Sequence, residues 1–242
     1  MTIKICGITT PDDAATILAA GADWFGLNLV AGPRRIPLDV AGRILVETGL
    51  YEAAVALVAA DALGDPERCP AALAALGLRR LQIYGHPSRS ALDELSAAGL
   101  SWIAVHHLAP PPAPSEFRAP LDRSAALAAL ADAAKRSGDD GASFLLLDTA
   151  SPLLGGSGRR SDWGMLVEAR DRGLLQGAPP ILLAGGLTPA NVAQAVCECR
   201  PAGVDVSSGV EIAPGRKDVG KVRAFVTAAR AAFAPPGRGS PQ

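Results

Sequence analysis

Short runs of apolar residues alternate along the chain with longer segments whose apolar positions recur at helical spacing. The predicted strands are the eight runs Ile3–Cys6, Trp24–Leu29, Ala54–Ala59, Arg80–Tyr84, Trp102–His106, Phe144–Asp148, Pro180–Ala184 and Val204–Ser207. The predicted helices are Pro11–Ala20, Leu38–Glu47, Pro70–Leu76, Ser90–Ala98, Ala125–Lys135, Asp162–Arg170, Pro189–Cys199 and Asp218–Ala232. Thr10 is the expected N-cap of the first helix, because Pro11 suits the first helical position.

This alternation predicts an α/β fold built around one parallel sheet. Apolar strands separated by helices indicate a sheet that is covered on both faces. Eight strand–helix pairs within 242 residues match the roughly 250 residues of a (β/α)₈ barrel. An open doubly wound sheet would carry a glycine-rich turn after its first strand, whereas here the glycine-rich loops lie in the last third. We therefore expect a single (β/α)₈ TIM barrel domain over residues 1–234 and a disordered tail over residues 235–242.

The amino-acid composition disfavours two classes of binding partner, nucleic acids and membranes. The net charge is −1 and aromatic residues make up 4% of the chain, which disfavours nucleic acid and a membrane surface as partners. No apolar run is long enough to span a bilayer, and the first residues enter a strand without an apolar leader. The four cysteines are too few for a disulfide scaffold. We expect a cytoplasmic protein without nucleic-acid or membrane partners.

A carboxylate and a thiol lie at the ends of two predicted strands, where the active site of such a barrel is built. Asp148 closes an apolar strand, and a buried carboxylate is costly unless it has a partner or a task. Cys6 closes the first strand, and Lys4 or Arg34 would have to lower the pKa of its thiol to make it a base. The alternatives are an inert buried cysteine and an aspartate that caps a loop or pairs with an arginine. Together the two groups favour proton-transfer chemistry.

Glycines and serines gather in the loops after the sixth, seventh and eighth predicted strands. Glycine lets backbone N–H groups approach an anion closely, and phosphate is commonly bound at this corner of the barrel. A single glycine pair is better explained as a turn, but three adjacent loops of this kind predict a phosphate site. The candidate residues are Gly156, Gly158, Gly185, Gly186, Ser207, Ser208 and Gly209.

Other reactive residues do not predict a metal site or a Schiff base. Cys197 and Cys199 are two residues apart on a predicted helix and so face different ways. The histidines lack the spacing of metal ligands, and we assign no catalytic role to His106 or His107. Three of the four lysines, Lys135, Lys217 and Lys221, are placed on helices or loops away from strand ends, which disfavours an aldolase. Lys4 shares the inward face of the first strand with Cys6.

Several motifs, in order along the chain, resemble those of the phosphoribosylanthranilate isomerase family. They are Lys4-Ile5-Cys6-Gly7-Ile8-Thr9, Gly21-Ala22-Asp23 with Gly26-Leu27-Asn28 and Pro33-Arg34, Leu147-Asp148-Thr149 with Gly155-Gly156-Ser157-Gly158, Leu183-Ala184-Gly185-Gly186-Leu187-Thr188-Pro189-Ala190-Asn191-Val192, and Gly203-Val204-Asp205-Val206-Ser207-Ser208-Gly209-Val210-Glu211 with Pro214-Gly215 and Lys217-Asp218. The resemblance runs from the third residue to the final helix.

The resemblance implies an Amadori rearrangement of N-(5′-phosphoribosyl)anthranilate in tryptophan biosynthesis, without a cofactor or a metal. It implies that Cys6 is the general base, that Asp148 is the general acid and that Arg34 holds the anthranilate carboxylate. The glycine and serine loops would hold the phosphate. Asn28 and Gln82, which lie near the ends of the second and fourth strands, complete the expected substrate-binding residues. We expect a phosphosugar substrate and either a monomer or a homodimer.

Three positions depart from the family pattern. Tyr84 stands where the family usually has histidine, Arg35 where it often has an aromatic residue, and Gly32 where it has a polar one. One alternative is therefore a related isomerase that acts on another phosphoribosyl amine. Another is a barrel that binds a phosphosugar without catalysis, which the presence of Cys6 and Asp148 disfavours. Indole-glycerol-phosphate synthase shares the phosphate corner but needs lysines and glutamates at strand ends, which the pattern does not supply.

Overall fold

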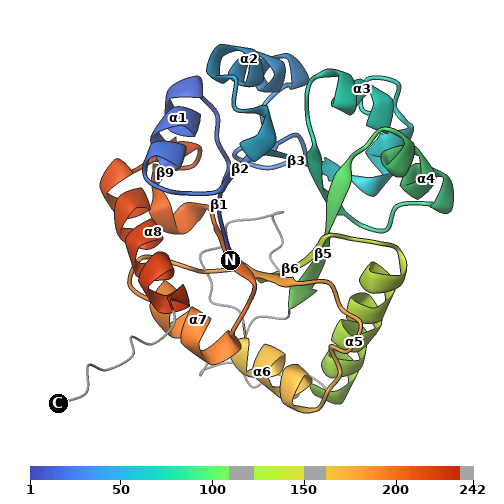
Figure 1. Cartoon of the computed structure of the whole chain (residues 1–242), viewed down its shortest axis with the longest axis vertical. Coiled ribbons are helices and arrows are strands. Elements are labelled where there is room, and N and C mark those ends of the chain that lie inside the picture. The colour runs from blue at the N-terminus through green and yellow to red at the C-terminus, as the bar shows by residue number, and fades with distance from the viewer. Residues whose placement is uncertain (109–122, 150–161, 235–242) are drawn as a thin grey trace.

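The computed structural model describes residues 1–108, 123–149 and 162–234. Eight parallel strands close into a barrel in sequential order, with β8 pairing back onto β1, and helices form a ring around them (Figure 1). The predicted (β/α)₈ barrel is therefore confirmed. The strands are β1 (Thr2–Cys6), β2 (Trp24–Asn28), β3 (Ala54–Ala59), β4 (Arg80–Tyr84), β5 (Ser101–Leu108), β6 (Phe144–Thr149), β7 (Ile181–Leu183) and β8 (Gly203–Val206).

Each strand is followed by a helix, as the alternating pattern predicts. The helices are α1 (Pro11–Ala19), α2 (Leu38–Thr48), α3 (Pro70–Ala75), α4 (Arg89–Ala97), α5 (Arg123–Asp139), α6 (Trp163–Asp171), α7 (Val192–Cys199) and α8 (Val219–Phe233). Thr10 accepts a hydrogen bond from the Asp13 amide at 3.2 Å and so caps α1 as expected. Within the described ranges no helix is both long and apolar enough to cross a membrane.

Five short elements were not predicted from the sequence. They are the 3₁₀ turns η1 (Tyr51–Ala53), η2 (Ala60–Gly64) and η3 (Ser208–Val210) and the antiparallel pair β9 (Glu211–Ala213) and β10 (Arg216–Lys217). Elements of two to five residues are too short to show a hydrophobic period. The expected tail over residues 235–242 lies outside the described residues, as does the proline-rich stretch after Leu108.

Two apolar clusters form because side chains alternate along each strand. One face of every strand packs against the helices in a large continuous core. The opposite faces form a small cluster inside the barrel from Val55, Ile103, Leu146, Leu182 and Ala184. Toward the carboxyl ends of the strands the inward positions become polar, which creates the place for a site.

Two glycines inside helices meet different surroundings. A Cβ atom added at Gly138 of α5 would lie 2.1 Å from the backbone oxygen of Gly177, so the absence of a side chain lets the helix touch the loop before β7. A Cβ atom at Gly42 of α2 would meet only the Leu76 side chain, at 3.7 Å, which is ordinary contact. At Gly138 glycine is needed for packing, whereas at Gly42 it brings only its poor helix propensity.

We predict opposite effects of alanine at these two positions. Gly138→Ala should lower the free energy of unfolding by about 1–3 kcal/mol, because the backbone of residue 177 must move. Gly42→Ala should raise it by about 0.5–1 kcal/mol, because the helix gains a better helix former without a clash. Urea denaturation of both variants measures this, and equal effects of the same sign would contradict the packing explanation.

Candidate active site

Cys6 lies at the carboxyl end of β1 and is 8% exposed. Its register partner on β2 is Gly26, and a Cβ atom there would lie 2.7 Å from the Cys6 Sγ atom. The backbone oxygen of Gly26 also accepts hydrogen bonds from the amides of Gly7, at 3.0 Å, and Ile8, at 2.9 Å. Glycine at position 26 therefore makes the room in which the thiol sits, a role that a glycine within an apolar strand could have signalled.

A buried ion pair lies below the thiol, because Lys4 is two residues before Cys6 on the same face of β1. Lys4 has no exposed surface, and its Nζ atom donates to Asp205 Oδ1 on β8 at 3.0 Å. Burial acts to lower the pKa of Lys4, but Asp205 and Cys6 together raise it, so the side chain is an ammonium ion. The prediction that Lys4 lines the site beside Cys6 agrees with this arrangement.

The expectation that local positive charge lowers the pKa of Cys6 is wrong in its net result. Burial raises the pKa of the thiol, and the ammonium groups of Lys4 and Lys217 offset only part of that effect. Glu211 first, and the charge of Cys6 to a smaller extent, raise the pKa of Arg34, so this cation also interacts with Cys6 but does not reverse the effect of burial on the thiol. The resting side chain is therefore a thiol, and its thiolate is a stronger base than that of an exposed cysteine.

A second buried cluster reaches the same strand end through the β9–β10 pair. The Lys217 Nζ atom donates to the Cys6 backbone oxygen at 2.5 Å and to Glu211 Oε1 at 2.7 Å. Lys217 was predicted to lie away from strand ends, and this is wrong because the hairpin folds back over β1. Glu211 was not predicted as a site residue, although an acid between Val210 and Ile212 was a signal of burial.

Arg34 is held by Glu211 rather than left open. Its Nε atom donates to Glu211 Oε1 at 2.8 Å and its Nη2 atom to Oε2 at 2.6 Å, which is the two-pronged geometry of arginine with a carboxylate. Burial raises the pKa of Glu211, but Arg34 and Lys217 outweigh it and the net shift is downward, so the carboxylate is charged. The Arg34 Nη1 atom makes no hydrogen bond to any residue that the structure describes.

Asn28 and Gln82, both predicted to bind substrate, already have partners in the protein. Asn28 Oδ1 accepts a hydrogen bond from the Val30 amide at 3.0 Å and so shapes the loop after β2. Gln82 is 1% exposed, and its Nε2 atom donates to the Tyr84 hydroxyl at 3.1 Å. The Gln82 Oε1 atom is buried and has no hydrogen-bond partner among the residues that the structure describes. Gln82 therefore lies beneath Tyr84 rather than at the surface of the site.

Asp148 lies at the carboxyl end of β6 and is half-buried. Its register partner on β5 is His107, whose ring stacks on that of Tyr84 with centroids 6.0 Å apart. Burial lowers the pKa of His107, so its imidazole is favoured in the neutral form. The structure thus places an acid, an imidazole and a phenol side by side on β6, β5 and β4.

The predicted phosphate site, formed by the loops after β6, β7 and β8, lies only partly within the described residues. Gly156 and Gly158 lie outside the described residues. Gly185 and Gly186 adopt positive φ angles of 83° and 66°, and their amides make no hydrogen bond within the described ranges. A Cβ atom at Gly209 would lie 1.9 Å from the Leu187 backbone oxygen, so the loops after β7 and β8 touch there.

The serines of this corner differ in what the structure assigns them. The Ser207 hydroxyl donates to the Cys6 backbone oxygen at 3.1 Å, so it braces the end of β1. Ser208 begins the η3 turn. In the part of the chain that is described, no group of three or more histidine, cysteine or acidic side chains is placed to hold a metal ion.

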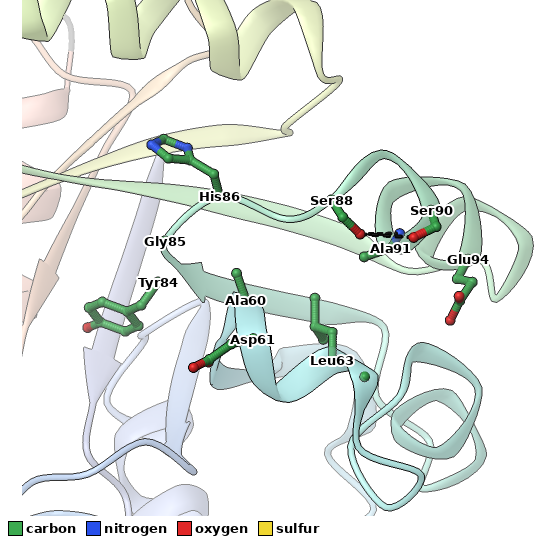
Figure 2. A pocket seen from close by; sticks show the side chains of 11 residues that line it. Ala60, Asp61, Leu63, Tyr84, Gly85, His86, Ser88, Ser90, Ala91 and Glu94 are labelled. Carbon is green, nitrogen blue, oxygen red and sulfur yellow. Dashed lines mark hydrogen bonds between the residues drawn. The ribbon is translucent and has the colours of Figure 1, made fainter.

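A further cavity of about 620 Å³ opens beside the site on the rim of the barrel, between the ends of β3 and β4. Its lining includes Ala60, Asp61, Tyr84, His86 and Glu94 (Figure 2). The ring of Tyr84 extends away from the end of the cavity where Glu94 lies. Tyr84 therefore contributes both to this cavity and to the polar interior of the barrel.

Comparison with known proteins identifies the family. A family model described as N-(5′-phosphoribosyl)anthranilate (PRA) isomerase matches residues 122–228. The N-(5′-phosphoribosyl)anthranilate isomerase of Cellvibrio japonicus is 37% identical over 234 residues, which cover 96% of this chain and 94% of that protein. The Thermotoga maritima phosphoribosyl anthranilate isomerase structure is 27% identical, covers 96% of this chain and 99% of that one, and superposes with a TM-score of 0.73.

A solved phosphoribosyl anthranilate isomerase in complex with reduced 1-(o-carboxyphenylamino)-1-deoxyribulose 5-phosphate is also similar to the chain. It is 25% identical, with a TM-score of 0.70, and the match covers 96% of this chain and 99% of that one. The barrel fold and the near full-length relatives point to the same family. The chain belongs to the N-(5′-phosphoribosyl)anthranilate isomerase family, and it is an isomerase of tryptophan biosynthesis.

Proposed function

We propose that the isomerisation proceeds by general acid–base catalysis with Cys6 as the base and Asp148 as the acid. The observation that carries this proposal is the placement of both groups at carboxyl strand ends around one barrel mouth, on β1 and β6. Burial first, and after it the charges of Cys6 and Asp148, raise the pKa of Tyr84, and the influence of both charges on one tyrosine supports their facing a common space. A barrel that only binds a phosphosugar would gain nothing from this pair.

The chemical steps balance without an external reagent. Asp148 gives a proton to the ribose ring oxygen, the C1–O bond breaks, and the nitrogen lone pair forms an iminium ion with C1. The Cys6 thiolate then takes the proton from C2, and the electron pair of that bond forms an enolamine. The enol proton leaves oxygen and a proton is added at C1, which gives the ketone and completes the isomerisation.

Protonation states set a condition on this mechanism. The carboxyl group of Asp148 must carry a proton, and Cys6 must be a thiolate, when the substrate reacts. The Lys4 ammonium ion, held by Asp205, supplies the positive charge that stabilises a thiolate two residues away. The active form is therefore the one in which the remaining proton of the pair resides on Asp148.

Substrate binding is assigned to cationic and backbone groups. The Nη1 edge of Arg34 is proposed to bind the anthranilate carboxylate, with Glu211 fixing the guanidinium plane. The glycines and serines of the loops after β6, β7 and β8 are proposed to bind the phosphate. The complex of the related isomerase with a reduced deoxyribulose 5-phosphate supports a phosphosugar ligand here.

The proposed chemistry also bears on the cofactor requirement of the enzyme. The substrate's own nitrogen forms the iminium ion, so the proposed mechanism uses no catalytic lysine, cofactor or metal. We propose a cytoplasmic enzyme, which suits a step of amino-acid biosynthesis. For its oligomeric state we propose either a monomer or a homodimer.

We predict that Cys6→Ala and Asp148→Asn each lower kcat by about 10²–10⁴-fold, because each removes one partner of the proton transfers. The assay follows loss of fluorescence of phosphoribosylanthranilate formed in situ from anthranilate and phosphoribosyl pyrophosphate. Cys197→Ala, a change of the same kind at an exposed cysteine, is the control and should leave kcat unchanged. Near wild-type turnover by either variant would refute its assignment. Failure of the folded wild type to turn over would favour another phosphoribosyl amine as substrate.

We predict a pH dependence for alkylation of the Cys6 thiol. Only the thiolate reacts, and burial raises the pKa of this thiol, so its alkylation rate should continue to rise to a higher pH than that of exposed Cys197. Iodoacetamide labelling followed by mass spectrometry resolves the two sites within one protein. A midpoint for Cys6 below that of Cys197 would contradict the raised pKa.

We predict that Arg34→Ala raises KM by about 10–100-fold, because a charge-assisted hydrogen bond to the substrate carboxylate is lost. Arg35→Ala is the matched control, since Arg35 is the neighbouring residue and lines an outer cavity, and its KM should stay near that of the wild type. Thermal denaturation checks folding, because Arg34 also holds Glu211. An unchanged KM for Arg34→Ala, or a raised KM for Arg35→Ala alone, would show that the carboxylate binds elsewhere.

A further inference from the structure

Tyr84 is a polar residue at the mouth of the barrel to which the acid–base mechanism gives no role. It closes β4 and is half-buried, and its ring extends away from the end of the rim cavity where Glu94 lies. The ring is fixed on one side by stacking on His107 of β5. A rigid phenol at a strand end of this barrel is in the place where substrate contacts are made.

The hydrogen bonding of Tyr84 leaves its proton available. The hydroxyl oxygen accepts from Gln82 Nε2 at 3.1 Å, and no described residue accepts the hydroxyl proton. Burial, and after it the charges of Cys6 and Asp148, raise the pKa of Tyr84 well above 10.0. The side chain is therefore a neutral phenol, which can donate one hydrogen bond to a ligand.

Gln82 fixes the direction of that hydrogen bond. It is 1% exposed, and its own oxygen Oε1 is buried without a partner in the described part of the chain. The amide presents its N–H group, not its oxygen, to the Tyr84 hydroxyl at 3.1 Å. If Oε1 faced the phenol, it would take up the proton and Tyr84 could not donate to anything else.

The neighbouring strands place the phenol between the two proposed catalytic groups. Strands β4, β5 and β6 are adjacent, with Tyr84 stacked on His107 and His107 in register with Asp148. The influence of Cys6 on the same hydroxyl comes from across the barrel, on β1. A donor in this position faces the part of a bound sugar from which Cys6 removes a proton.

We propose that Tyr84 is a further substrate-contacting residue of the isomerisation, whose hydroxyl donates a hydrogen bond to the oxygen on C2 of the sugar. This proposal rests on the acid–base roles of Cys6 and Asp148. When the enolamine loses its O–H proton, electron density grows on that oxygen on the way to the ketone, and a preorganised donor stabilises it. Gln82 is the positioning residue that leaves the Tyr84 proton free.

The central test is Tyr84→Phe, which keeps the ring and its stacking and removes only the hydroxyl. We expect kcat to fall by about 10²-fold while KM changes by less than about twofold, because the hydrogen bond strengthens in the transition state. Tyr51→Phe is the matched control, since Tyr51 lines the outer cavity between α2 and α3, and it should behave as the wild type. An unchanged kcat, or a raised KM with an unchanged kcat, would overturn the proposal.

Gln82→Glu tests the positioning role. A carboxylate at this position accepts a hydrogen bond from the Tyr84 hydroxyl, so kcat should fall about as far as in Tyr84→Phe, and the double variant should show no further loss. Gln82→Met, which is apolar and similar in size, is the second variant if the glutamate disturbs folding. Methionine has no N–H group to orient the Tyr84 hydroxyl, so kcat should fall while the melting temperature stays unchanged. Additive losses in the double variant, or full activity of Gln82→Met, would overturn the positioning role.

Cys6→Ala and Asp148→Asn in the same assay separate the two proposals. If both lose turnover while Tyr84→Phe retains it, the acid–base mechanism stands and the role of Tyr84 is refuted. If either retains turnover, the acid–base mechanism fails, and with it the basis for the Tyr84 hydrogen bond.

Discussion

The ion pair of Lys4 and Asp205 lies on the seam where the first strand closes the barrel against the last. The two residues are register partners on β1 and β8, and the Lys4 ammonium group has no contact with solvent. Removing such a charge from water costs several kcal/mol, so the lysine is tolerated only with its partner in place. Closing the barrel in this register is therefore tied to placing a positive charge beneath Cys6.

The thiol depends on this arrangement from several sides. Gly26 leaves the space for its sulfur, while Ser207 and Lys217 hold the backbone oxygen of the same residue. The cations and the burial act on its pKa in opposite directions, and burial prevails. A thiol that is difficult to ionise but backed by fixed positive charge gives a strong base in a defined position.

The β9–β10 pair extends the site beyond the eight repeated units. It returns Glu211 and Lys217 to the end of β1, where Glu211 also meets Arg34 from the loop after β2. The Glu211 carboxylate thereby lies between two cations, Arg34 and Lys217, in a largely buried cluster that keeps one net positive charge. The side of the site opposite Tyr84 is thus built from charges, whereas β4 to β6 contribute a neutral phenol, an imidazole and an acid.

The barrel, its order of elements and the strand-end positions of Cys6 and Asp148 could be predicted from the chain alone, because hydrophobic periodicity and strand ends are properties of neighbouring residues. It also indicated Lys4 correctly, since alternation along a strand places it on the face of Cys6. The partners of the polar side chains, in contrast, depend on the folded barrel. Arg34 binds Glu211, Gln82 lies under Tyr84 and Lys217 returns to β1, and these partners are 177, 2 and 211 residues apart. The direction of a hydrogen bond leaves no periodic pattern in the sequence, and neither do the opposing effects of burial and distant charges on a pKa. Both depend on contacts that form only when the barrel closes.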